Sequence, residues 1–144
     1  MANKRITELN AASSITGSEL AELVQGGTNV KSTVNAIWNP APFDVGTQAG
    51  SITLNRANGV IQKMVINNTT TILSPSGGTE GLQLKLWVTP TTNSQSFSVD
   101  TSSILIPTDS AISFPKTLTQ DKLYIMLFQH NGTNWMLNSL IGGY

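Results

Sequence analysis

The chain contains no cysteine, a single histidine and few charged residues. Without cysteine it has no disulfide, thiol nucleophile or thiolate zinc site, and one histidine cannot form a cluster of histidine ligands. Only 11% of its 144 residues are charged, against about 25% in an ordinary soluble domain. Eight basic residues balance eight acidic ones. We therefore expect neither nucleic acid nor an anionic membrane as a partner, because a neutral chain does not attract them over long range.

The sequence also has no long apolar run. Nothing approaches the roughly 18 apolar residues of a membrane span, and no apolar segment follows the first residues as in a secretory signal. Polarity comes instead from Ser, Thr, Asn and Gln, which make up roughly a third of the chain, well above their usual share. Hydrophobic residues reach 39%, which is enough for a core. The length predicts one domain, or one domain with an arm.

Residues 1–38 are predicted to form an arm, because they contain small, widely spaced apolar groups interrupted by glycines. Residues 23–25 and 30–34 have the composition of two short strands around the Gly26-Gly27 turn. A single helical turn through residues 19–21 is the alternative. Either structure buries too little to be stable alone, so we expect the arm to dock on its own body, on another copy or on a partner.

Residues 39–49 are predicted to be a linker, because Pro40 and Pro42 restrict the backbone and donate no hydrogen bonds. Residues 50–144 form the expected body. Turn signals such as Asn67-Asn68 and Asn131-Gly132 separate short β-type segments. The predicted strands are 51–54, 60–66, 69–73, 82–88, 96–99, 104–106, 111–114, 123–129 and 135–140. The sequence therefore predicts an all-β fold with a β-sandwich or jelly-roll-like body.

The clearest of these segments is 82–88. Alternation directs one set of its side chains to one face and the other set, which includes Trp87, to the opposite face. The set on the first face is Leu82, Leu84, Leu86 and Val88. We therefore expect Trp87 to be exposed or covered by a second layer.

No residue pattern points to catalysis, a metal or a cofactor. His130 precedes an Asn-Gly turn, where we expect a solvated side chain rather than a general base. Asp100 and Asp109 flank a short strand and are better explained as turn residues than as a catalytic carboxylate pair. The glycine-rich segment 74–81 has no Gly-Lys-Ser/Thr ending and does not open a helix. We therefore expect a protein that is not an enzyme and has no cofactor.

Aromatic residues give the one binding signal. They could form a surface on which sugars stack or an interface between copies, because Trp and Tyr remove much area from water at modest entropic cost. Burial within the monomer is the alternative for Trp135 and for Trp87. The candidates are Trp38, Phe43, Trp87, Trp135 and Tyr144.

The order of several short motifs resembles proteins of tailed-bacteriophage virions. In the first part these are Ile6-Thr7-Glu8-Leu9, Thr16-Gly17-Ser18-Glu19-Leu20, Leu23-Val24-Gln25-Gly26-Gly27 and Lys31-Ser32-Thr33-Val34-Asn35-Ala36-Ile37. This stretch is similar to the N-terminal attachment module of phage head-fibre, decoration and tail-fibre proteins. The second part resembles a phage β-domain through Gly50-Ser51-Ile52-Thr53-Leu54, Val60-Ile61-Gln62-Lys63 and Gly132-Thr133-Asn134-Trp135.

The resemblance implies a structural protein of the virion, usually a homotrimer, made in the host cytoplasm. Its arm would bind the major capsid protein and its β-domain would project from the capsid surface. We expect a capsid decoration (cement) protein or short head fibre, because a tail fibre usually continues beyond the equivalent of Tyr144 into a long shaft or tip. A tail-associated protein that binds host-surface glycans is the alternative. The residues expected to anchor the arm are Ile6, Leu9, Leu20, Leu23, Val24, Val30, Val34 and Ile37.

Overall fold

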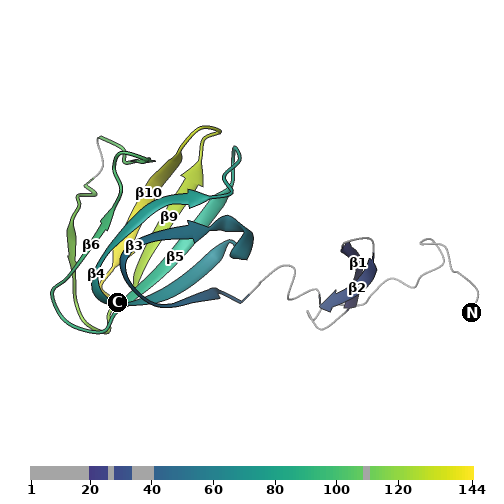
Figure 1. Cartoon of the computed structure of the whole chain (residues 1–144), viewed down its shortest axis with the longest axis horizontal. Helices are drawn as coiled ribbons and strands as arrows, with labels where there is room; N and C mark the ends of the chain where they lie inside the picture. The colour runs from purple at the N-terminus through teal and green to yellow at the C-terminus, as the bar shows by residue number, and fades with distance from the viewer. Residues whose placement is uncertain (1–19, 26–27, 34–40, 109–110) are drawn as a thin grey trace, which may run out of the picture. The chain divides into compact units, whose positions relative to one another are not determined.

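The computed structural model describes residues 20–25, 28–33, 41–108 and 111–144 (Figure 1). The chain divides into two compact units, Met1–Ala41 and Pro42–Tyr144. In the described part of the chain, no helix is long and apolar enough to cross a membrane.

The first unit contains a β-hairpin. Strand β1 (Leu20–Gln25) pairs antiparallel with β2 (Thr28–Thr33). Leu23 lies opposite Val30, and Glu22 lies opposite Lys31. The hairpin predicted around Gly26-Gly27 is confirmed, and the alternative helical turn is wrong for residues 20 and 21, which belong to β1.

The second unit is all-β, as the sequence predicts. A short 3-10 turn, η2 (Arg56–Asn58), separates its first two strands. Its sheet has the strand order β7-β10-β9-β5-β4-β6-β8, and β3 pairs with β4 beside this path. The strands are β3 (Phe43–Asn55), β4 (Ile61–Ser76), β5 (Gln83–Pro90), β6 (Gln95–Val99), β7 (Ile104–Leu105), β8 (Lys116–Leu118), β9 (Tyr124–His130) and β10 (Trp135–Gly142).

Parallel and antiparallel pairs occur in the same sheet. β3, β5 and β6 each pair in parallel with β4, whereas β9 pairs antiparallel with both β5 and β10. This connectivity departs from a jelly roll, which is built from antiparallel Greek keys.

The sheet curls because β3 and β4 bend along their length. Residues 61–66 of β4 pair with β5, whereas residues 70–72 pair with β6. One half of the sheet therefore consists of β7, β10, β9 and β5, the other half consists of β6 and β8, and β4 belongs to both. The register of β3 shifts next to Gly46 and Gly50, whose φ angles of 82° and 73° suit glycine. The Gln62 side-chain amide donates to the Asn55 carbonyl oxygen over 2.6 Å, which brings the start of β4 back to the end of β3.

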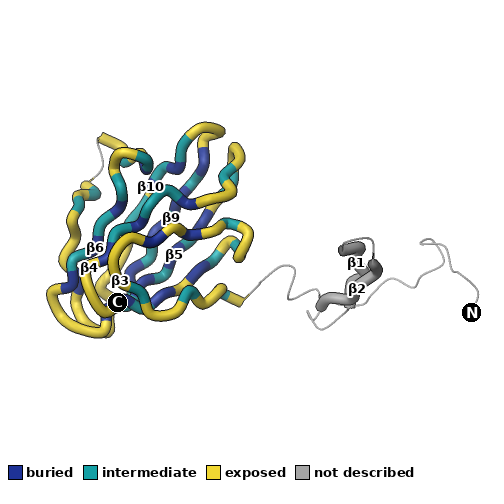
Figure 2. The backbone as a smooth tube through the Cα atoms, viewed as in Figure 1, coloured by how far each residue is buried: buried dark blue, intermediate teal, exposed yellow. Residues whose placement is uncertain are grey.

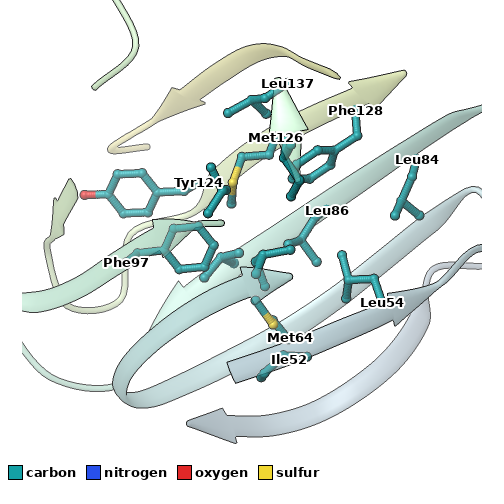
Figure 3. Close-up of a cluster of buried hydrophobic side chains, with 14 of the residues drawn as sticks. Ile52, Leu54, Met64, Leu84, Leu86, Phe97, Tyr124, Met126, Phe128 and Leu137 are labelled. Atoms are coloured by element: carbon teal, nitrogen blue, oxygen red, sulfur yellow. The ribbon is translucent and has the colours of Figure 1, made fainter. Parts of the chain in front are cut away.

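The core lies inside this curl. Along β5, β6 and β9, every second residue is buried, as the alternating blue and teal segments of Figure 2 show. Figure 3 shows side chains from both halves of the sheet converging, with Ile52, Met64 and Phe97 directed toward the same interior as the β9 residues. The predicted inward stripe of the segment 82–88 is confirmed, since Leu84, Leu86 and Val88 are fully buried and Leu82 packs against them.

Three sequence predictions about segment boundaries are wrong. The body's strands begin at Phe43, so residues 43–49 are part of β3 rather than of a linker that reaches 49. The prediction rests on Pro40 and Pro42, which restrict the backbone but precede the first residue of β3. Within the segment, Val45 packs against the core. Asn67-Asn68 lies within the continuous strand β4, where the chain passes between its two sheet halves.

The third difference concerns residues 111–114, which were predicted to form a strand. They are not in a strand; β8 begins later, at Lys116. Ile112 and Phe114 instead pack against the margin of the core, and the Phe114 ring lies 6.4 Å from that of Phe97. The alternation of apolar and polar residues in this segment therefore results from the burial of its two apolar side chains, and it does not indicate a strand.

Candidate functional site

The outward side of one half of the sheet combines apolar and polar side chains. Along β4, β5, β9 and β10, about half of the residues that alternate with the core are hydrophobic, and lysine, glutamine, threonine and serine residues lie among them. We call the hydrophobic part of this surface the apolar outer face. It consists of Ile61, Val65, Trp87, Ile125, Leu127, Met136 and Ile141.

Strand register places these side chains in continuous rows. Trp87 of β5 lies between Lys63 of β4 and Ile125 of β9, and Ile125 in turn lies opposite Ile141 of β10. In the next row, Lys85 lies between Ile61 and Leu127. Residues opposite one another on neighbouring strands project from the same side of a sheet. Trp87, Ile125 and Ile141 therefore form one apolar row across β5, β9 and β10. Polar residues interrupt the rest of the face, since Ser139 lies opposite Leu127 and Gln129 lies opposite Met136.

The outward side of the other half of the sheet is different. There, Ser51 of β3 lies opposite Thr71 of β4, which lies opposite Ser98 of β6. On the next pair of strands, Ser96 of β6 lies opposite Thr117 of β8. This hydroxyl-rich surface has the polar-out pattern expected of a sheet with one face in water. The apolar outer face is thus a local property of one half of the sheet.

A small recess lies at the margin of the apolar outer face where β3, β4 and β5 meet. Its volume is about 140 Å³, and its walls combine the Trp87 ring, a threonine, an ion pair and apolar side chains. The lining residues are Asp44, Lys63, Met64, Val65, Trp87, Thr89 and Leu123. It offers an aromatic surface together with polar groups of several kinds.

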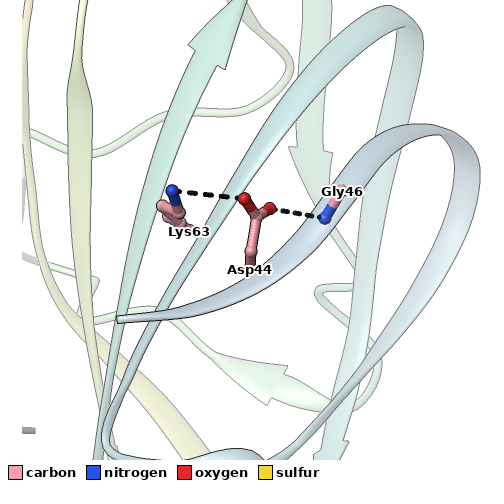
Figure 4. Close-up of polar contacts among 3 residues, drawn as sticks. All are labelled: Asp44, Gly46 and Lys63. Atoms are coloured by element: carbon pink, nitrogen blue, oxygen red, sulfur yellow. Dashed lines mark hydrogen bonds and ion pairs between the residues drawn. The ribbon is translucent and has the colours of Figure 1, made fainter. Parts of the chain in front are cut away.

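The ion pair of this recess is shown in Figure 4. The Lys63 ammonium nitrogen lies 3.2 Å from an Asp44 carboxylate oxygen, and the other carboxylate oxygen accepts a hydrogen bond from the Gly46 N–H over 2.8 Å. The Gly46 N–H and the Lys63 ammonium hold the pKa of the Asp44 carboxyl below its ordinary value. Asp44 is therefore ionised at neutral pH, and the recess has charges of both signs.

Trp87 has an unmatched polar group. Its indole N–H is buried and meets no acceptor among the described residues. A buried donor without an acceptor costs about 1–3 kcal/mol. The ring is therefore held at this position by its contacts and not by a hydrogen bond.

A second recess, of about 380 Å³, adjoins the opposite margin of the apolar outer face. It is lined by Leu105, Ile106, Pro107 and Met136. Met136 of β10 lies opposite Leu105 of β7, which is 45% exposed. The apolar surface thus continues from β10 to β7.

Three of the predicted aromatic residues lie at or next to the first recess. Trp87 lines it, and the exposed Phe43 precedes the lining residue Asp44. The exposed Tyr144 accepts a hydrogen bond at its carbonyl oxygen from the N–H of Leu123, another lining residue. The sequence therefore identified part of this surface.

Trp135 does not belong to it. Its side chain is 2% exposed and packs edge-on against the His130 ring at a centroid distance of 5.2 Å. The prediction that Trp135 binds sugars or another copy is wrong, and the alternative of burial within the monomer is confirmed.

The remaining site predictions lie wholly or partly outside the described residues. Trp38 and four of the anchoring residues fall there: Ile6, Leu9, Val34 and Ile37. The other four, Leu20, Leu23, Val24 and Val30, belong to β1 and β2. Their backbone pairing is described, and their role in anchoring stays a prediction.

Sequence reasoning missed most of the apolar outer face. The strand β9 carries a signal for this face, because its residues Tyr124–Phe128 form an unbroken apolar run. Such a run indicates a strand with apolar surroundings on both faces. The sequence predicts a strand here, but it does not predict a surface formed by the outward residues Ile125 and Leu127.

Of the polar residues considered for catalysis, His130 and Asp100 have structural contacts, and Asp109 lies outside the described residues. His130 is buried rather than solvated, so that prediction is wrong; its Nδ1 accepts a hydrogen bond from the Gly132 N–H over 3.1 Å. The Asp100 carboxylate accepts from the Ser102 and Ser103 hydroxyls, each over 2.6 Å. These hydroxyls and the Ser102 N–H keep the pKa of Asp100 below its ordinary value. Asp100 closes a turn in this way, as its sequence context predicts.

In the described part of the body and the hairpin, no group of three or more His, Asp and Glu side chains is placed to hold a metal ion. No protein-family model matches the chain, and a comparison with curated proteins finds no match.

Proposed function

We propose that this chain is a non-enzymatic structural protein of a tailed-phage virion. As an oligomer, it binds the assembled capsid through residues 1–38 and presents its β-body on the capsid surface. The expected partners are the major capsid protein and further copies of the chain. The proposal combines the resemblance of the sequence motifs with the division of the molecule into two units.

The observation that favours it most is this division. The unit Pro42–Tyr144 has its own continuous core, with residues from Ile52 to Leu137 packed in one cluster. The other unit contains a two-stranded hairpin as its described structure. An isolated two-stranded hairpin is at best marginally stable in water and needs a further surface. A segment with this property suits attachment to a partner.

Binding of this kind would stabilise the capsid by mass action. A ligand that binds only the assembled lattice lowers the free energy of that state, by an amount that grows with the ratio of free ligand to its dissociation constant. The protein needs no reacting group for this effect. It needs a segment that contacts the lattice and a body that folds without it.

The first prediction tests the attachment segment. A variant without residues 1–41 should keep the β-type circular dichroism spectrum of the body, because the core lies wholly in the second unit. It should lose binding to expanded capsids of the phage that encodes it, measured by co-sedimentation. The full-length double variant Leu23→Asp/Val30→Asp, which changes a facing pair of the hairpin, should also bind weakly. Full binding by the truncated chain would contradict the assignment of the arm.

A second candidate function, glycan binding, is favoured by the recess beside Trp87. Aromatic rings stack on sugar faces, and ion pairs and hydroxyls bind sugar hydroxyls; Trp87, the Asp44–Lys63 pair and Thr89 supply these groups together. In this function the chain would be a tail-associated protein that binds host-surface glycans.

The glycan candidate makes a separate prediction. Binding on a glycan array should disappear in Trp87→Ala and persist in part in Trp87→Phe, which retains an aromatic face. Thr71→Ala, on the hydroxyl-rich side of the other sheet half, is the matched control and should bind as the unchanged chain does. If the unchanged chain binds no glycan, or if Trp87→Ala binds equally well, this candidate is eliminated.

A further inference from the structure

The turn between β9 and β10 holds an Asn-Gly pair beside the ring of the chain's one histidine. Asn131 and Gly132 are exposed to water, whereas the preceding His130 is 8% exposed. Asn-Gly is a reactive dipeptide, because glycine has no side chain that hinders attack of its backbone nitrogen on the asparagine carboxamide. The hydrogen bonds of this turn meet both of the groups that would react in such an attack.

The nucleophile would be the Gly132 nitrogen, and its proton faces a base. The Gly132 N–H donates to Nδ1 of His130 over 3.1 Å. Since Nδ1 accepts, the neutral ring carries its proton on Nε2, and the lone pair of Nδ1 is directed at the N–H. A base within about 2.6–3.2 Å of the proton that it abstracts has the geometry of a general base. His130 is therefore placed to take the Gly132 proton as the nitrogen attacks.

The Asn131 carboxamide is oriented for the same reaction. Its Oδ1 accepts two backbone hydrogen bonds, from the Thr133 N–H over 3.0 Å and from the Asn134 N–H over 2.8 Å. Both donors point at the oxygen on which negative charge develops when Cγ is attacked, as the donors of an oxyanion hole do. Neither bond holds Nδ2, which is the atom that would depart as ammonia.

The His130 ring is fixed in its position by its surroundings. A Cβ atom at Gly78 would overlap the ring, and the Trp135 ring packs edge-on against it at a centroid distance of 5.2 Å. The backbone of His130 is held as well, because its carbonyl oxygen accepts from the Gly81 N–H and its N–H donates to the Leu82 carbonyl oxygen, each over 2.9 Å. Base and nucleophile are therefore preorganised in the folded chain.

We propose that the fold accelerates the conversion of Asn131 to aspartate and isoaspartate through a succinimide, with His130 as the general base. The Gly132 nitrogen bonds to Cγ of Asn131 while its proton passes to Nδ1 of His130. The Cγ–Nδ2 bond then breaks, and the amide nitrogen leaves as ammonia with the proton that His130 received. Water opens the succinimide at either carbonyl. Overall, water is consumed and ammonia is released, nothing is oxidised or reduced, and no partner from the proposed function is needed.

The chain offers an internal comparison in its other Asn-Gly pair. Asn58 ends η2 and is exposed, and the Gly59 N–H donates to the Arg56 carbonyl oxygen over 3.1 Å. A backbone carbonyl oxygen accepts a hydrogen bond but takes no proton at neutral pH. The two pairs thus share the dipeptide and differ in the group that the glycine N–H meets.

Incubation of the full-length chain at neutral pH, followed by peptide mapping with mass spectrometry, tests this proposal. In the folded chain, the rate of amide loss at Asn131 should exceed that at Asn58 by at least about tenfold, which is within what one general base contributes. In the chain unfolded in urea the two rates should become similar, because His130 and the turn no longer hold their positions. A smaller ratio in the folded chain, or the same ratio in urea, overturns the proposal.

The variant His130→Asn separates the base from the hydrogen bond. Its side-chain oxygen can accept from the Gly132 N–H in place of the imidazole Nδ1, but an amide oxygen takes no proton at neutral pH. The variant should lower the rate at Asn131 by at least about tenfold and leave the rate at Asn58 unchanged. An unchanged rate at Asn131, in a variant whose circular dichroism shows the native fold, overturns the proposal. The comparison of the folded with the unfolded unchanged chain needs no variant and decides the matter if His130→Asn does not fold.

Discussion

Replacing Trp135 with alanine is expected to lower the free energy of unfolding by about 3–5 kcal/mol. The side chain is 2% exposed and packs edge-on against His130. It lies in β10 between His130 of β9 and Ile104 of β7, so its loss opens a cavity where three strands meet. Urea unfolding followed by far-ultraviolet circular dichroism measures this change without depending on tryptophan fluorescence.

Trp87→Ala is the matched control for this experiment. Trp87 is only half-buried, and its ring lies on the outward side of β5. Its removal takes away less buried area and also eliminates an unmatched indole N–H. We expect a clearly smaller loss than for Trp135→Ala when both are compared at one low protein concentration. Equal losses for the two variants would contradict the assignment of Trp135 to the core and of Trp87 to the surface.

The contrast between these two tryptophans also marks the limit of sequence reasoning. For Trp87, strict alternation with Leu84, Leu86 and Val88 fixed the side of the strand on which it lies. Trp135 begins a strand directly after a turn, and its neighbours include both apolar and polar residues. Its burial depends on His130 and Ile104, which come from other strands. Local periodicity does not contain that information.

The curl of the sheet was beyond prediction for a related reason. Parallel pairing of β3 with β4 and of β4 with β5 depends on contacts between residues roughly twenty positions apart, such as Phe43 with Gln62 and Ile61 with Lys85. Turn signals indicate where a strand can end, but they do not distinguish a hairpin from a strand that bends and continues. Asn67-Asn68 therefore predicts the end of a strand, although β4 continues through it.

The apolar outer face could not be predicted for the same two reasons, because neither local periodicity nor turn signals specify which strands become neighbours. Each of its strands was identified from sequence, but the face exists only because β4, β5, β9 and β10 become neighbours in that order. Ile61 and Ile141 are far apart along the chain and lie in the same surface only through the register of the strands between them. A sequence can mark an outward apolar residue, whereas the strand order decides whether several such residues form one patch.

Gly142→Ala is expected to destabilise the body by about 1–3 kcal/mol, the usual cost of forcing an extra group into a packed site. Gly142 of β10 lies opposite Tyr124 of β9. A Cβ atom at this position would overlap Cδ1 of the Tyr124 ring. The ring cannot move aside freely, because Tyr124 is 7% exposed and its hydroxyl oxygen accepts a hydrogen bond from the Thr119 N–H over 3.0 Å.

A double-mutant cycle separates this overlap from any general effect of alanine near the end of β10. In the Tyr124→Ala background, the ring is absent and Gly142→Ala should cost little. The difference between the two backgrounds gives the coupling between residues 124 and 142. Thermal and urea unfolding of the four proteins measure it. An unchanged cost in both backgrounds would mean that Gly142 is required for another reason than the close approach of the Tyr124 ring.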